Sequence, residues 1–313
     1  MNISLSDAAA LLKDRDEVLI LTHKRPDGDT IGCASALCHA LRRLGKTAYL
    51  YRNSDINELY APIAAPYLAP EGYIGNTVLS TDIAEATLFP PGWSGNVLLA
   101  VDHHPARSEF SDYILRDSSR AACGELLIEL IEALCGGLDR EEADLLYIAV
   151  STDTGCFVHA NTNAATHRAA AKLLEAGADL RKWNKLLFCT KSPARLALEG
   201  EVYATLRSYK EHTMNIAVIT LDMLRRTGVI EGDLEDLASL AGQVAGNRAS
   251  VTVRETKEGR SKVSLRTDGT INATEVCARF GGGGHRMASG CEIDLPPHEA
   301  AEAVRRVLEE VWP

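Results

Sequence analysis

The chain has 313 residues, of which 46% are hydrophobic and 24% are charged, a composition that is ordinary for folded globular proteins and does not indicate disorder. Its formal net charge of −10 argues against a general binder of duplex DNA, because such a protein needs an extended basic face. Charged residues interrupt every apolar run before it reaches membrane length.

The eight cysteines form no C-x-x-C pair, and the N-terminus has no basic stretch followed by an apolar one. Both features favour free thiols and a cytoplasmic protein. A small anionic substrate is compatible with the negative net charge, because metal ions and a few arginines can reverse the potential inside one cleft. We therefore expect neither a membrane nor duplex DNA as a partner.

The first informative stretch is EVLILTHKRPDGDTIG, at 17–32. Its apolar run at 18–21 predicts a buried strand, and a Pro/Gly turn then brings His23, Asp27 and Asp29 to the start of a predicted helix. Neighbouring carboxylates repel one another unless a metal ion or a proton lies between them. These residues alone leave two interpretations open, a cation site or a solvated turn in which Asp29 caps the helix.

The first half of the chain alternates strand-like and helix-like segments. A helix is predicted at 31–44, and three more strands are predicted at 47–52, 77–82 and 96–104. This order predicts an α/β fold whose parallel sheet carries helices on its faces. The carboxyl ends of parallel strands share one edge, where ligands bind. Four side chains should therefore gather in one crevice: His23, Asp27, Asp82 and Asp102.

Helical spacing at 122–134 and 140–150 completes the first half, and Asp153 falls where the second of these helices should stop. A mostly helical region follows, and a new strand-rich pattern begins near residue 214. We expect a first domain at 1–190, a helical linker at 191–212 and a smaller α/β domain at 213–313.

A second informative stretch is Asp102-His103-His104-Pro105, which follows five apolar residues. Adjacent side chains on a strand point to opposite faces, so the two histidines can share a site only where the strand has ended. One imidazole could then bind a metal ion and the other face a substrate, with Asp102 accepting a hydrogen bond from His103. The alternative is a pair of surface histidines, which this run of titratable residues after an apolar strand makes less favourable.

Five segments together resemble the signature motifs of the DHH phosphoesterase superfamily with its DHH-associated C-terminal domain. In order, they are H-x-x-P-D-G-D-x-I-G at 23–32, T-D at 81–82, D-H-H-P at 102–105, T-D-T-G at 152–155 and G-G-G-G-H-x-x-A-x-G at 281–290. One such motif would be weak, but five in the family's order are specific. The chain is most similar to the bacterial nanoRNase and pAp phosphatase group. That group hydrolyses very short single-stranded RNA, adenosine bisphosphate and, in some members, linear or cyclic dinucleotides.

The resemblance implies a centre of two divalent metal ions, usually Mn²⁺. A first ion would be bound by His23 and Asp27. A second would be bound by Asp29, His103 and Asp153, and Asp82 would bridge the two. A mixed set of imidazole and carboxylate suits Mn²⁺ better than Ca²⁺, which prefers oxygen ligands alone. Two ions roughly 3.5 to 4 Å apart can activate a hydroxide and stabilise both oxygens of an in-line displacement at phosphorus.

The resemblance also implies a catalytic pair and a phosphate-binding set. His104 would face the scissile phosphate as a donor or acid, beside Asp102. Consecutive glycines permit close approach of backbone N–H groups to an anion, although such a run is often only a flexible loop. With the neighbouring cations, we expect a clamp on a terminal phosphate. Its residues would be Arg266, Gly282, Gly283, Gly284, His285 and Arg286.

Two features leave the substrate open. Arg107 stands where many family members have asparagine, and surface arginines such as Arg107 and Arg116 are commonly solvated rather than bound to phosphate. The same site could serve a cyclic or linear dinucleotide, and a non-catalytic nucleotide-binding module is the alternative from another class. The glycine motif argues against inorganic pyrophosphate. The sequence leaves the oligomeric state open, a homodimer included.

Overall fold

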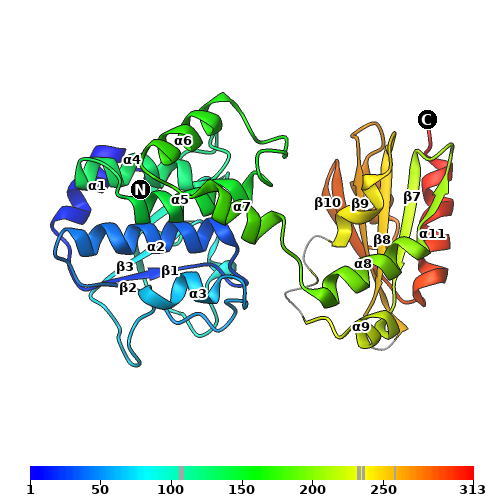
Figure 1. Ribbon diagram of the computed structural model, residues 1–313, viewed down its shortest axis with the longest axis horizontal. Helices are drawn as coiled ribbons and strands as arrows, with labels where there is room; N and C mark the ends of the chain where they lie inside the picture. The colour runs from blue at the N-terminus through cyan, green and yellow to red at the C-terminus, as the bar shows by residue number, and fades with distance from the viewer. Residues whose placement is uncertain (106–108, 231–233, 235–236, 257–258) are drawn as a thin grey trace. The chain divides into compact units, whose positions relative to one another are not determined.

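A computed structural model describes residues 1–105, 109–230, 234, 237–256 and 259–313 (Figure 1). The substitution of Arg107 for asparagine lies outside these residues. The chain divides into an N-terminal unit, Met1–Thr190, and a C-terminal unit, Lys191–Pro313. Within the described ranges, no helix combines the length and the apolar character that a membrane span requires.

The N-terminal unit is built on a five-stranded sheet in the order β2-β1-β3-β4-β5. Its strands are β1 (Val18–Leu21), β2 (Ala48–Leu50), β3 (Thr77–Thr81), β4 (Val97–Asp102) and β5 (Ser111–Arg116). Every neighbouring pair is parallel, which confirms the predicted sheet. All four side chains of β1 are buried, as expected where helices cover both faces of a parallel sheet.

Seven α-helices surround this sheet in the described part of the unit. They are α1 (Leu5–Lys13), α2 (Gly28–Arg43), α3 (Ala61–Ala64), α4 (Cys123–Cys135), α5 (Arg140–Asp153), α6 (Ala164–Glu175) and α7 (Leu180–Phe188), with 3-10 turns η1 (Ala65–Tyr67) and η2 (Ala86–Leu88). The buried faces of α2, α4 and α5 form one apolar cluster with the strands. This packing fixes the ends of α2 and α5 near the end of β1.

Gly32 allows α2 and α5 to approach closely, because a Cβ atom there would lie 2.4 Å from the Leu145 carbonyl oxygen. We expect Gly32→Ala to lower the free energy of unfolding by about 1–3 kcal/mol, since backbone must shift to relieve the clash. Gly200→Ala is the matched control, because no atom lies within 4 Å of its added methyl group and its helix, Pro193–Thr205, should gain about 0.5–1 kcal/mol. Urea unfolding of both variants checks this prediction, and equal effects would contradict it.

The C-terminal unit is a six-stranded mixed sheet in the order β10-β11-β9-β8-β7-β6. Its strands are β6 (Arg207–Tyr209), β7 (Met214–Ile219), β8 (Ala249–Glu255), β9 (Ser261–Thr267), β10 (Gly283–His285) and β11 (Ala288–Ile293). Only β7 and β8 pair in parallel among these strands. Its helices are α8 (Pro193–Thr205), α9 (Leu221–Thr227), α10 (Ala273–Ala278) and α11 (Pro297–Glu310), with η4 (Leu237–Gln243).

The segment 191–212, expected to link the two domains, is instead part of the C-terminal unit. It contains α8, whose Leu198 and Val202 are buried in one apolar cluster with Ala217 and Ile219 of β7. It also contains β6, which pairs with β7. Burial of these apolar side chains against the sheet explains why the helix belongs to this unit.

Candidate metal centre

The predicted site residues of the N-terminal unit lie at the carboxyl edge of its sheet. His23 follows β1, Asp82 follows β3, and Asp102 ends β4. These three strands are neighbours in the sheet, so their ends are adjacent. The ends of two helices complete the edge. Asp27 is the N-cap of α2, and Asp153 is the last residue of α5.

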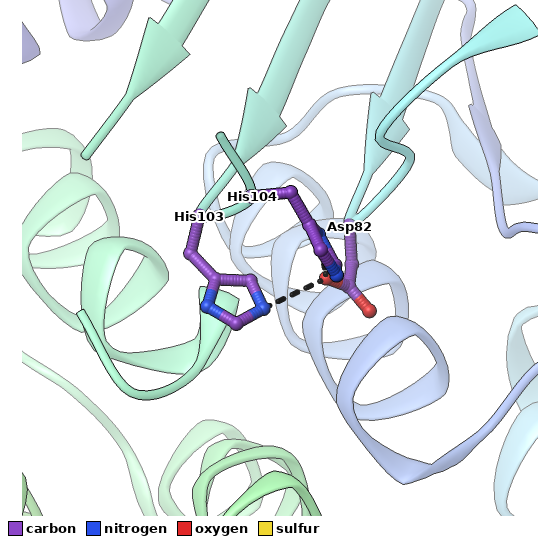
Figure 2. A group of neighbouring side chains, drawn as sticks. All are labelled: Asp82, His103 and His104. Carbon is purple, nitrogen blue, oxygen red and sulfur yellow. Dashed lines mark ion pairs between the residues drawn. The ribbon is translucent and has the colours of Figure 1, made fainter. Parts of the chain in front are cut away.

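Asp82 lies at the centre of this group. Its Oδ2 is 3.7 Å from His23 Nε2, and its Oδ1 is 3.5 Å from His103 Nε2. Figure 2 shows the imidazoles of His103 and His104 directed toward the Asp82 carboxylate. Asp82 also has a positive φ of 59°, a conformation that aspartate tolerates better than most residues and that often occurs at functional sites.

The donor atoms form two groups, and each has an imidazole beside the Asp82 carboxylate. In the first group, His23 Nε2 lies 3.5 Å from Asp27 Oδ1. In the second, His103 Nε2 lies 3.6 Å from Asp153 Oδ2 and 3.9 Å from Asp29 Oδ2. Within His23–Asp27–Asp82 and within Asp29–His103–Asp153, one donor atom from each residue lies within 4.8 Å of the others. The structure therefore brings together all six residues that the resemblance implies as ligands.

The contacts in this group fit bound cations better than direct hydrogen bonds. The distances from Asp82 to both imidazoles exceed the range of good hydrogen bonds. Asp82 Oδ1 and His103 Nε2 are buried, and neither finds a hydrogen-bond partner in the described structure. Buried polar atoms without partners are costly, and an ion between them would satisfy both. Imidazole and carboxylate donors together suit a divalent transition-metal ion.

Electrostatic repulsion between the acids supports the same interpretation. Burial, together with the charges of Asp29 and Asp27, holds the pKa of Asp82 well above its usual range. Burial and the charges of Asp153 and Asp27 likewise raise the pKa of Asp29. Such carboxyl groups disfavour the folded state when ionised, because the unfolded chain ionises them more readily. Divalent cations at this position would remove that cost.

Asp29 does not cap α2, since the cap is the Asp27 side chain, which accepts from the backbone N–H groups of Asp29 and Thr30. The Asp29 carboxylate instead accepts hydrogen bonds from the backbone N–H groups of Cys123 at 2.7 Å and Gly124 at 3.0 Å. These groups begin α4, where the helix dipole favours a negative charge. Asp29 is 1% exposed and thus rigidly held.

Backbone carbonyls orient two of the imidazoles. His23 Nδ1 lies 2.9 Å from the Lys24 carbonyl oxygen, and His103 Nδ1 lies 3.2 Å from the Arg120 carbonyl oxygen. These contacts assign the proton to Nδ1 and leave the Nε2 lone pairs facing Asp82. The prediction that Asp102 orients His103 is therefore wrong.

Asp102 orients His104 instead. Its Oδ1 lies 2.9 Å from His104 Nδ1 and accepts the His104 backbone N–H at 3.1 Å. Side chains two positions apart in an extended chain lie on the same side, which explains the choice of partner. The hydrogen bond from His104 to Asp102 raises the pKa of His104. The His104 side chain is 44% exposed, so a substrate can reach the imidazole.

The C-terminal unit holds the other predicted residues at one end of its sheet. Strand register places both Arg266 of β9 and His285 of β10 opposite Ala288 of β11, so the two residues flank one strand, and both are exposed. Arg286 donates to the Gly269 carbonyl oxygen at 3.1 Å.

The glycine run is partly a strand rather than a loop. A Cβ atom at Gly282 would lie 2.2 Å from the Gly290 carbonyl oxygen, and one at Gly284 would lie 2.6 Å from the Ala288 carbonyl oxygen. These glycines are therefore needed for close packing of β10 on β11. Gly283 faces open space on the edge strand, where unpaired backbone groups are available to a ligand.

Comparison with known proteins assigns both units to described families. Residues 17–150 match the DHH family N-terminal domain, and residues 213–312 match the DHHA1 domain. The chain is 31% identical to the bifunctional oligoribonuclease and PAP phosphatase NrnA of Thermus thermophilus, over 94% of this chain and 89% of that protein. It is 26% identical to the Bacillus subtilis protein of the same name, over 89% of this chain and 90% of that one.

Among solved structures, an exopolyphosphatase-related protein from Bacteroides fragilis resembles this chain with a TM-score of 0.84 and 24% sequence identity. The match covers 98% of this chain and 96% of that one. At this level of identity, the similarity establishes a shared fold.

Proposed function

We propose that this chain, which belongs to the DHH family of phosphoesterases and is a hydrolase of phosphoester bonds, uses two divalent metal ions in its reaction. The ions would be Mn²⁺ by preference, and the substrates would be short oligoribonucleotides and pAp. The products would be mononucleotides. The observation that carries the proposal is the buried Asp82 carboxylate between the imidazoles of His23 and His103, at distances longer than hydrogen bonds.

The proposed centre would use all six predicted ligands. His23 and Asp27 would hold one ion, Asp29, His103 and Asp153 the other, and Asp82 would contact both. When bound, the two ions would activate water and neutralise charge on the phosphoryl group. The backbone N–H groups at the start of α4 hold the Asp29 carboxylate in place. The backbone carbonyl of Arg120 holds the His103 imidazole with Nε2 toward the site.

We assign His104 as the general acid. Its Nδ1 is held by Asp102 and its side chain is partly exposed, so Nε2 would carry a proton toward the leaving oxygen. The C-terminal unit would bind the substrate through Arg266 and His285, two exposed residues on either side of β11. A guanidinium beside an imidazole can clamp a terminal phosphate.

Two observations support short substrates. The relatives from Thermus and Bacillus are named for activity on oligoribonucleotides and PAP. The net charge of −10 disfavours long nucleic acids, whose binding depends on the neutralisation of many phosphates. Capture of one terminal phosphate would suffice for a substrate of a few nucleotides.

A substrate panel tests the proposal. Dinucleotide to pentanucleotide RNA, pAp and cyclic dinucleotides would be incubated with Mn²⁺ and separately with chelator, and products measured by chromatography. We expect Mn²⁺-dependent release of mononucleotides from the short RNA and of AMP from pAp. Cleavage restricted to cyclic dinucleotides would replace this proposal, and tight binding without turnover would indicate a nucleotide-binding module.

Arg266→Gln tests the role of the C-terminal unit. Loss of a charge-assisted hydrogen bond to phosphate costs about 1.5–3 kcal/mol, so we expect KM for a 5′-phosphorylated trinucleotide to rise about 10- to 100-fold while kcat changes little. The control is Arg260→Gln, because Arg260 is exposed in the same unit and pairs with Asp294. An unchanged KM for Arg266→Gln would refute the clamp.

A further inference from the structure

Arg116 and Asp102 form a buried pair behind His104. They lie directly opposite one another on the neighbouring strands β5 and β4. Arg116 Nε is 3.6 Å from Asp102 Oδ2, and the two side chains are 13% and 0% exposed, respectively. Both atoms are buried, and neither has a hydrogen-bond partner among the residues the structure describes.

The two oxygens of Asp102 therefore have different neighbours. Oδ1 lies 2.9 Å from His104 Nδ1, and Oδ2 faces the Arg116 guanidinium. A fully buried carboxylate without a partner is costly, so a nearby guanidinium stabilises it. Arg116 is the arginine that lies within ion-pair distance of Asp102 in the described structure. Without the guanidinium, Asp102 Oδ2 would lose its ion-pair partner, and the carboxylate would no longer be fixed with Oδ1 toward His104 Nδ1.

We propose that Arg116 is a positioning residue for the hydrolytic reaction, acting through Asp102 to hold His104 with its Nε2 toward the leaving oxygen. This inference rests on the proposed function. It replaces the view of Arg116 as a solvated or phosphate-contacting arginine, because its guanidinium is directed at a buried carboxylate. The row Arg116, Asp102, His104 thus links the carboxyl ends of β5 and β4 to the surface of the site.

In the proposed step, His104 gives up one proton and keeps the other. The oxygen of a hydroxide forms a bond to phosphorus as the bond from phosphorus to the leaving ribose oxygen breaks. The proton on His104 Nε2 passes to that leaving oxygen, and the proton on Nδ1 stays in the hydrogen bond to Asp102. Water restores the Nε2 proton after product release. Arg116 exchanges no proton and contacts no reacting atom.

A double-mutant cycle tests the proposal. We expect Arg116→Met to lower kcat on a 5′-phosphorylated diadenylate by about 10- to 100-fold with KM unchanged, since general acid catalysis contributes at least this much. Arg116→Lys should recover most of the loss. In a His104→Ala background, Arg116→Met should have no further effect, because the two side chains act as one unit.

A second readout separates positioning from stability. The p-nitrophenyl ester of uridine 5′-phosphate has a leaving group that needs no proton, so Arg116→Met should hydrolyse it at the wild-type rate. Arg43→Met is the matched control, because it removes an arginine from another buried carboxylate, Glu142, at the far end of α2. It should lower the melting temperature without altering either rate. Arg116→Gln, which has a polar end group and a similar length to Met, replaces Arg116→Met if the latter does not fold.

Three results would overturn the inference. The first is an effect of Arg116→Met that persists in the His104→Ala background, and the second is an equal loss on the p-nitrophenyl ester. The third is a raised KM with unchanged kcat, which would identify Arg116 as a phosphate contact. An inactive wild-type protein with Mn²⁺ would instead refute the proposed function, so the two failures can be distinguished.

Discussion

Asp82→Asn should lower kcat for hydrolysis of a short oligoribonucleotide by at least about 10³-fold, the scale expected when a site loses the group that organises its charge stabilisation. Asp82 is the residue that approaches both His23 and His103. Asparagine keeps the shape of the side chain and also tolerates the positive φ of 59° at this position. It lacks the negative charge needed to hold two cations.

The control for this substitution is Asp112→Asn, which removes the same charge from an exposed position on β5. Kinetics with saturating Mn²⁺ should show wild-type rates for the control. Circular dichroism should show that both variants are folded, because the neutral amide relieves repulsion with Asp29 and Asp27. An Asp82→Asn variant with more than about a tenth of the wild-type kcat would contradict the assigned role, since that residual rate corresponds to less than about 1.4 kcal/mol of transition-state stabilisation.

Removal of divalent metal should abolish hydrolysis and also destabilise the N-terminal unit. Without cations, the buried carboxylates of Asp29 and Asp82 lie close together, and their raised pKa values reflect that cost. An ion that binds only the folded state stabilises it by about 2.7 kcal/mol at 100 times its dissociation constant. We therefore expect chelator to lower the melting temperature of the wild-type protein and added Mn²⁺ to restore both the melting temperature and activity.

Calorimetry of the wild-type protein and Asp82→Asn with and without Mn²⁺ checks this prediction. The variant should show little Mn²⁺-dependent stabilisation, while Asp112→Asn should respond like the wild type. Full hydrolytic activity in excess chelator would contradict a metal-dependent reaction. Equal stabilisation of all three proteins by Mn²⁺ would mean that the ion binds elsewhere.

The sequence predicts much of this site because its residues follow recognisable strands. His23, Asp82 and Asp102 each come after an apolar run, and the carboxyl ends of neighbouring parallel strands necessarily meet. The parallel sheet itself follows from the alternation of strand and helix patterns. The position of Asp153 at the end of α5 follows from the helical spacing before it.

The partners of these residues could not be predicted in the same way. Asp29 bonds to Cys123 and Gly124, more than 90 positions away, through backbone groups that carry no signal in the sequence. His103 is oriented by a carbonyl oxygen of Arg120, which any residue could supply. The strand β5, which brings Arg116 to Asp102, is not among the predicted strands, because its pairing depends on β4 rather than on local pattern.

The structure around the glycine motif could not be predicted from the sequence either, for a different reason. A run of glycines indicates flexible or close-packed backbone without distinguishing the two. In the structure, Gly282 and Gly284 are required by contacts with β11, while Gly283 faces open space. Their role toward a phosphate therefore depends on side chains that flank the strand, Arg266 and His285.

The most direct test of the account is the number and position of Mn²⁺ ions in a crystal of the wild-type protein, read from anomalous scattering at the manganese edge. We predict two anomalous peaks beside Asp82, one within bonding distance of His23 and Asp27, the other within bonding distance of Asp29, His103 and Asp153. Peaks located away from Asp82, or none in a crystal grown from active enzyme, would contradict the two-metal centre.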